Sequence, residues 1–244
     1  MTDPPSRLEA YRAAHEQVLA RIGAACARTG RVPTEVSLVA VSKTIAADAL
    51  RDAVAAGLDR LGENRVQEGA AKAPEVPGAR WELVGPLQSN KARRALEVFD
   101  SIETVDSVEL GRRLDRLVPE VRPGARYPIL LEVNVDEDPA KTGFAADRLD
   151  AALGDLLGLS HLALRGLMTV GRLTSDPDEA RRTFRGLRLL SERCRARWPE
   201  LGPDLSMGMT DDFELAVEEG ATIVRVGRAL FGERHDPGPA APAG

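Results

Sequence analysis

The stretch Ser37-Leu-Val-Ala-Val-Ser-Lys43 is a short apolar run that ends in two polar residues. A helical pattern with Leu50 and Val54 follows it and stops at Gly57, so the two segments predict one β/α unit. The same alternation continues along the chain and predicts seven further strands, at 59–64, 81–87, 101–106, 128–135, 164–170, 204–209 and 223–230. Eight strands separated by helices favour a closed barrel over an open sheet.

Helical patterns lie between these strands, at 46–56, 65–73, 89–98, 107–118, 146–157, 176–197 and 211–219. A further helix is predicted before the first strand, because Ser6 and Glu9 have the spacing of a capping box and apolar residues then recur at helical intervals up to Gly30. Asp106 and Glu109 have the same spacing and predict the start of helix 107–118.

The length of 244 residues suits one large domain, because α/β barrels of this size are common. We therefore expect an α/β fold, a single (β/α)8 TIM-type barrel over residues 1–235 with an extra N-terminal helix. The tail 236–244 consists mainly of Pro, Gly and Ala and is predicted to be disordered.

Charge and hydropathy limit the classes of partner. A net charge of -5 argues against binding to nucleic acid or to a membrane surface, because both require a basic face. The start of the chain, MTDPPSRLEA, contains no apolar targeting segment, and no later run approaches the roughly 18 apolar residues that span a membrane. We expect a cytoplasmic monomer whose partner is a small molecule.

In barrels of this kind the active site lies at the C-terminal ends of the strands. Lys43 ends the first strand, where partial desolvation would lower the pKa of its amine toward the neutral form that a Schiff base requires. The other lysines, Lys72, Lys91 and Lys141, lie in helix or loop contexts where solvation is easy. Lys43 is therefore the predicted covalent anchor.

Two turns are candidates for holding a phosphate. Ser206-Met-Gly-Met-Thr210 leads from the seventh strand into a helix, and Gly227 and Arg228 stand at the end of the eighth strand. Small residues and backbone N–H groups at such turns bind anions, and the loops after strands seven and eight are the usual phosphate position. The alternative is that both glycines only relieve crowding at strand ends.

Arg225 lies in a run that is otherwise apolar, and a buried arginine must find an acceptor because it keeps its proton. A pyridine nitrogen or a carboxylate would satisfy it, and an ion pair between strand and helix is an equal alternative. None of the histidines, His15, His161 and His235, ends a predicted strand. This disfavours a Ser-His-Asp hydrolase and a histidine-based metal site.

An ordered series of motifs connects the chain to a known family. The motifs are AVSKT (40–44), GENRVQEG (62–69), GPLQSNKAR (85–93), DPAKTGF (138–144), LRGLMTVG (164–171), LSMGMTDDFELAVEEGAT (205–222) and VRVGRALFG (224–232). Over nearly its whole length the chain resembles the pyridoxal 5′-phosphate (PLP) homeostasis proteins. The resemblance implies a fold-type III PLP barrel, similar to the N-terminal barrel of alanine racemase without that enzyme's second domain.

The resemblance also implies roles for individual residues. Lys43 would form the Schiff base with PLP, Asn64 would lie against the cofactor, and Arg225 would face the pyridine nitrogen. The phosphate would be held, largely through backbone amides, by Ser206, Gly227 and Arg228. The other implied cofactor-binding residues are Met168, Met207, Gly208 and Thr210. Family members often carry His where this chain has Glu82. The resemblance therefore implies no role for the Glu82 side chain, and the expected PLP binding does not depend on it.

The function implied is a carrier and buffer of PLP in vitamin B6 homeostasis, with little or no catalysis. An arginine at the pyridine nitrogen weakens PLP as an electron sink, and neither Tyr11 nor Tyr127 is well placed as the second acid–base group of a racemase. A weak PLP-dependent racemase or lyase is the alternative, and a class I aldolase that uses Lys43 without cofactor is a third. Apo forms of PLP-dependent enzymes are candidate partners, with Lys141 hypothesised to take part in the hand-off.

Overall fold

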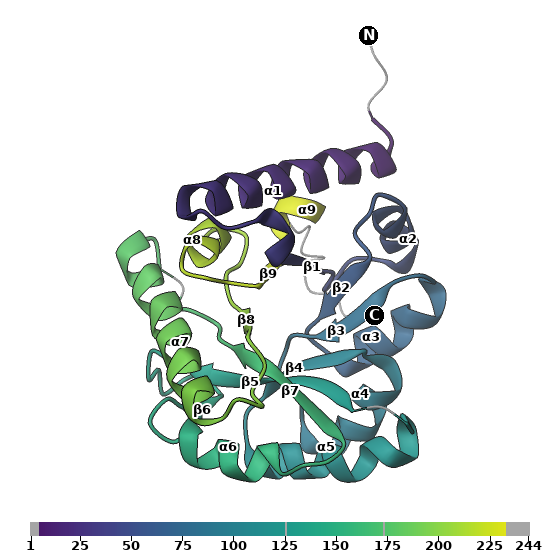
Figure 1. Ribbon diagram of the computed structural model, residues 1–244. Helices are drawn as coiled ribbons and strands as arrows, with labels where there is room; N and C mark the ends of the chain where they lie inside the picture. The colour runs from purple at the N-terminus through teal and green to yellow at the C-terminus, as the bar shows by residue number, and fades with distance from the viewer. Residues whose placement is uncertain (1–4, 125, 173, 233–244) are drawn as a thin grey trace, which may run out of the picture.

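The computed structural model describes residues 5–124, 126–172 and 174–232. Within these ranges eight parallel strands form a closed barrel surrounded by helices (Figure 1). The barrel strands are β1 (Ser37–Val41), β2 (Arg60–Glu63), β3 (Arg80–Leu83), β4 (Ser101–Val105), β5 (Tyr127–Asn134), β7 (Leu162–Met168), β8 (Asp204–Ser206) and β9 (Ile223–Val226). They pair in the order β4-β3-β2-β1-β9-β8-β7-β5, and pairing of β4 with β5 closes the ring. The predicted (β/α)8 barrel is confirmed.

The surrounding helices are α2 (Ala47–Ala55), α3 (Val66–Lys72), α4 (Ala92–Val98), α5 (Val108–Val121), α6 (Leu149–Leu157), α7 (Pro177–Arg197), α8 (Phe213–Glu218) and α9 (Arg228–Phe231). The extra helix α1 (Arg7–Thr29) packs across α2, α8 and α9, as Figure 1 shows. Its predicted start is confirmed, because Ser6 and Glu9 form both hydrogen bonds of a capping box. Gly30 ends it in a left-handed conformation.

Two layers of side chains follow from the alternation along each strand. Outward-facing residues such as Leu61, Leu83 and Ile102 belong to the main core between the strands and the helices. The barrel interior holds a smaller apolar cluster of Val39, Val84, Leu130, Met168 and Ile223. Charged residues share this interior, so part of it must be stabilised by hydrogen bonds and ion pairs.

Several predicted boundaries are wrong. The last strand ends at Val226 rather than at residue 230, because α9 begins at Arg228. Ser107, not Asp106, caps α5, and its Oγ accepts a hydrogen bond from the backbone N of Leu110. The predicted helix 89–98 begins as a 3-10 turn over Ser89–Lys91.

The two-residue strand β6 (Phe144–Ala145), which pairs with β5, was not predicted, because it is too short to show a period. The tail 236–244 and His235 lie outside the described residues. Among the residues that are described, no helix has the length and apolar character needed to cross a membrane.

Candidate functional site

Lys43 lies just past the C-terminal end of β1 and is partly buried. The next residue, Thr44, has a φ of 68°, in the left-handed region that residues other than glycine rarely adopt. Such conformations cost about 1–3 kcal/mol and persist where the surrounding structure enforces them. The chain therefore turns sharply directly after the predicted covalent anchor.

Ser42, the residue before Lys43, is hydrogen-bonded to an ion pair between Glu63 and Lys72. Ser42 Oγ donates to Glu63 Oε1 at 2.7 Å, and Lys72 Nζ donates to the same oxygen at 2.6 Å and to the Ser42 carbonyl at 2.9 Å. Burial raises the pKa of Glu63, while the bonds from Lys72 and Ser42 lower it. The expectation that Lys72 is easily solvated is wrong, because a fully buried carboxylate requires a cation beside it.

The two predicted phosphate turns meet at the C-terminal end of the barrel. The backbone N of Gly227 donates to Thr210 Oγ1 at 3.3 Å, and the backbone N of Arg225 donates to the carbonyl of Gly208 at 3.0 Å. Gly208 has a φ of 91°, and a Cβ there would lie 2.5 Å from the Cβ of Ala216 on α8. Glycine is therefore required for this turn to approach the helix.

The remaining predicted residues have different surroundings. Asn64 follows β2 and is partly buried. Its backbone lies so close to Gly85 that a Cβ on residue 85 would be 2.4 Å from the Asn64 carbonyl oxygen. Met168 packs inside the barrel, whereas Met207 packs in the core between strands and helices. Arg228 is half exposed on α9 and forms an ion pair with Asp211. Their contacts with a cofactor stay predictions.

Arg225 lies inside the barrel rather than between strand and helix. It is 4% exposed, and its Nη1 donates to Ser206 Oγ at 2.6 Å while its Nη2 donates to the carbonyl of Thr169 at 2.8 Å. Ser206 Oγ in turn donates to Glu103 Oε2 at 2.6 Å. Desolvation lowers the pKa of Arg225, and the nearby carboxylates of Glu103, Asp212 and Glu132 act against this shift. The Ser206 hydroxyl is thus engaged by interior side chains.

Sequence reasoning did not single out Glu103, which is 1% exposed. The signal was present in the strand Ser101-Ile-Glu-Thr-Val105, where Glu103 alternates with Ile102, a residue of the outer core. A carboxyl group on the inner face of a barrel requires a partner, and Arg225 on β9 is the matching cation.

Comparison with known proteins places the chain in a family. Residues 20–235 match the family described as alanine racemase, N-terminal domain. A pyridoxal phosphate homeostasis protein of Pseudomonas aeruginosa is 42% identical over 229 residues, which cover 92% of this chain and 96% of the relative. The chain belongs to the family of pyridoxal phosphate homeostasis proteins.

Solved structures of similar proteins extend this comparison. PipY of Synechococcus elongatus, a structure with PLP bound, has a TM-score of 0.77 and 42% identity, and the match covers 86% of this chain and 100% of PipY. Alanine racemase from Corynebacterium glutamicum has a TM-score of 0.68 at 17% identity, over 96% of this chain and 63% of the racemase. The likeness to the racemase is one of fold alone. Membership in the homeostasis family confirms the resemblance inferred from the motifs.

Replacing Lys72 by Met is expected to destabilise this family member by about 3 kcal/mol near pH 8, because the buried Glu63 carboxylate loses its cation. Loss of Lys72 also raises the pKa of Glu63 further above its unfolded value, so the folded state binds more protons and stability falls as pH rises. The difference in the free energy of unfolding between the wild type and Lys72→Met, measured by urea denaturation, should therefore be smaller near pH 5 than near pH 8. Lys91→Ala, in the turn before α4, is the control and should change stability by less than about 0.5 kcal/mol.

Proposed function

We propose that this chain binds PLP covalently through Lys43 and acts in the cytoplasm as a carrier and buffer of PLP, with little or no catalysis. The observation that carries the proposal is the structure of PipY with PLP bound, a relative with 42% identity that matches along its full length. The name of the Pseudomonas relative supports a role in PLP homeostasis.

The residues at the C-terminal end of the barrel fit the three polar parts of PLP. Lys43 offers an amine to the aldehyde, and condensation there would release one water molecule. The turns at Thr210 and Gly227 are joined by the hydrogen bond from the Gly227 backbone N to Thr210 Oγ1, and such a junction of small residues and backbone dipoles suits the phosphate. A guanidinium has five N–H donors, and Arg225 directs two of its nitrogens at Ser206 and Thr169, so further donors suit a pyridine nitrogen.

Carriage is supported over racemisation by the positions of the two tyrosines. Tyr127 is buried in the core outside the barrel, where its Oη donates to the carbonyl of Phe99 at 2.8 Å and burial raises its pKa. Tyr11 on α1 packs edge-on against Phe231. Bound PLP supplies an electron-withdrawing ring, but an arginine does not protonate the ring nitrogen, so carbanion chemistry is damped.

Purified protein is expected to be yellow, and borohydride reduction followed by peptide mass mapping should place a pyridoxyl group on Lys43. Lys43→Ala should lack both the absorbance and the adduct, while Lys91→Ala retains them. A colourless protein that cannot be reconstituted with PLP would contradict the proposal and would favour a cofactor-free aldolase that uses the same lysine.

Replacing Arg225 by Gln is expected to weaken PLP binding about tenfold or more, because a charged donor to the ring nitrogen is lost. The barrel should remain folded, since a protonated Glu103 does not require a cation beside it. Equilibrium dialysis measures the dissociation constant, and circular dichroism checks the fold. An unchanged dissociation constant would show that Arg225 does not face the ring.

We also propose that the chain is a monomer that delivers PLP to apo forms of PLP-dependent enzymes, with Lys141 taking part in the transfer. The large exposed apolar residues among those described, Leu19, Val32, Leu189 and Met209, are scattered over separate segments, which supports a monomer. Lys141 Nζ lies at the C-terminal end of the barrel, where it donates to the carbonyl of Val170 at 3.0 Å.

Lys141→Ala is expected to slow PLP transfer to an added apo-enzyme while leaving the spectrum of the loaded carrier unchanged, because the side chain is a quarter exposed and its partners are Asp136 and the carbonyl of Val170. Transfer is followed by recovery of activity in the acceptor. Lys91→Ala serves again as the control, and equal transfer rates for all three proteins would remove Lys141 from the proposal.

A further inference from the structure

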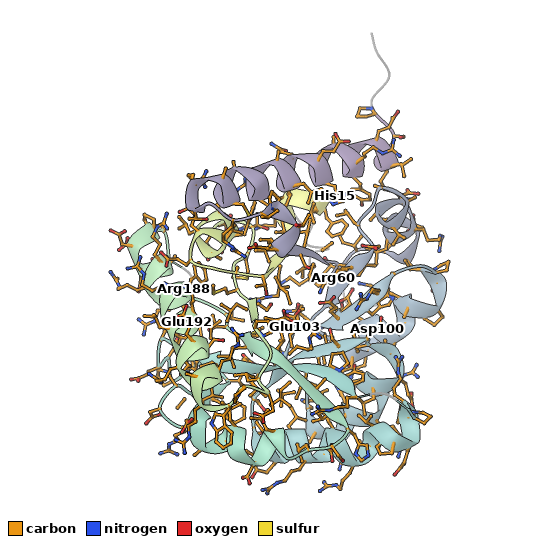
Figure 2. All side chains as sticks on the ribbon, in the orientation of Figure 1. His15, Arg60, Asp100, Glu103, Arg188 and Glu192 are labelled. Atoms are coloured by element: carbon orange, nitrogen blue, oxygen red, sulfur yellow. The ribbon has the colours of Figure 1, made fainter. Side chains whose placement is uncertain are left out.

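A chain of polar side chains crosses the barrel interior from its N-terminal end to Arg225. Arg60, at the start of β2, donates from Nε to Glu82 Oε1 at 2.7 Å. At the other end, Arg225 donates to Ser206 and Ser206 donates to Glu103 Oε2. Figure 2 labels Arg60 and Glu103 together in the middle of the molecule. The two halves meet at Glu82 and Glu103, whose side chains interact inside the barrel.

Glu82 and Glu103 are inward-facing residues on neighbouring strands. The register pairs Glu82 with Ser101, so Glu103 lies two residues further along β4 on the same face. Both are almost fully buried, at 3% and 1% exposure. Two carboxylates this close in a low-dielectric interior cannot both stay ionised.

The hydrogen bonds show where a proton fits. Glu82 Oε2 and Glu103 Oε1 are the oxygens of this pair that lack a donor, whereas the other oxygen of each residue accepts from Arg60 or Ser206. One proton between these two oxygens satisfies both of them. Burial and the Glu82 carboxylate raise the pKa of Glu103 to about 8, which agrees with a proton held there at neutral pH.

We propose that Glu82 and Glu103 share one proton and that this carboxyl pair, acting through Ser206, positions Arg225 and sets the positive charge that it presents to the pyridine nitrogen of bound PLP. The inference rests on the proposed function for its cofactor and on the interior contacts for the pair itself. Both glutamates are positioning residues, because neither is placed against the cofactor.

The pair can exchange its proton with solvent away from the cofactor. A cavity of about 400 Å³ opens at the N-terminal end of the barrel, and both glutamates line it. The charged residues that line this cavity with the pair are Glu35, Arg60, Arg80, Arg165 and Asp204. On the other side of the pair lies Arg225, which Glu132 and Asp212 also face. The proposed PLP site lies at the C-terminal end of the barrel, opposite this cavity, so bound PLP does not block proton exchange through the cavity.

The sign of the coupling follows from charge. With the proton present, the pair carries one negative charge between Arg60 and Arg225. Loss of the proton places a second negative charge beside Arg225 and offsets the charge that the ring nitrogen meets. PLP affinity should therefore fall as pH rises through the titration of the pair. By reciprocity, bound PLP should hold the proton to a higher pH than the apo-protein does.

Two amide substitutions separate this role from a structural one. Glu103→Gln mimics the protonated acid, since its amide can donate to Glu82 and accept from Ser206. Glu82→Gln removes the like charge and donates to Glu103, which favours the ionised form of Glu103. Above pH 8 the wild type should bind PLP several-fold more weakly than it does near pH 7. Glu103→Gln should still bind PLP there with the affinity that the wild type has near pH 7. Glu82→Gln should already be weak near pH 7.

The proton itself is observed without PLP, by infrared spectroscopy of the carbonyl stretch of a protonated carboxylic acid in the apo-protein. The wild-type minus Glu103→Gln difference should contain this band near pH 7 and lose it above pH 8. Glu132→Gln is the matched control, because Glu132 is another buried carboxyl of the interior with a pKa raised by burial, and it should leave the Glu103 band unchanged.

The outcomes distinguish this inference from the proposed function. Absence of the band, or affinities for PLP that shift in the same direction in both variants, overturns the role of the pair even if PLP binds. A present band in a protein that never binds PLP overturns the proposed function and, with it, the effect on the cofactor. Opposite shifts of the two variants, with circular dichroism spectra like the wild type, support the inference.

Discussion

The burial of one guanidinium governs the interior of this barrel. Arg225 keeps its charge at any ordinary pH, and a charge without partners in a low-dielectric interior costs several kcal/mol. Its acceptors come from three separate parts of the ring: Ser206 at the end of β8, the carbonyl of Thr169 after β7, and Glu103 on β4 through Ser206. These strands must therefore present polar atoms at one height in the barrel, which constrains their register.

The rest of the interior adapts to this polar chain. Barrel interiors of this fold are usually filled by layers of branched apolar side chains. Here a small apolar cluster around Val39, Val84 and Leu130 occupies part of the space, and the chain from Arg60 to Arg225 occupies the rest. Polar contacts thereby extend into the interior from both ends and meet at Glu82 and Glu103, whereas an apolar interior would have kept them apart.

The environment of Lys43 is built from both sides of the sheet. Outside the ring, Lys72 and Glu63 hold Ser42, and the left-handed Thr44 turns the chain immediately after the lysine. Beside it, Gly227 passes so close to β1 that a Cβ there would lie 3.3 Å from the carbonyl oxygen of Val41. Lys43 and the turns at Gly208 and Gly227 are thus placed by contacts at the ends of β1 and β9.

The sequence by itself determined the barrel, the N-terminal cap of α1, and the placement of Lys43 and Asn64 after the first two strands, because these depend on local periodicity and on short motifs. It did not reveal that Lys72 is buried against Glu63, that Ser107 caps α5, or that Arg225 faces the interior. Nor did it identify Glu103 as the partner of Arg225. The Ser107 cap and the Lys72–Glu63 pair are local but depend on how each helix is placed against its strand. The contacts of Arg225 and Glu103 depend on closure of the ring, which brings β4 and β9 to opposite sides of one interior although about 120 residues separate them. Only the tertiary structure decides which charges meet across that space.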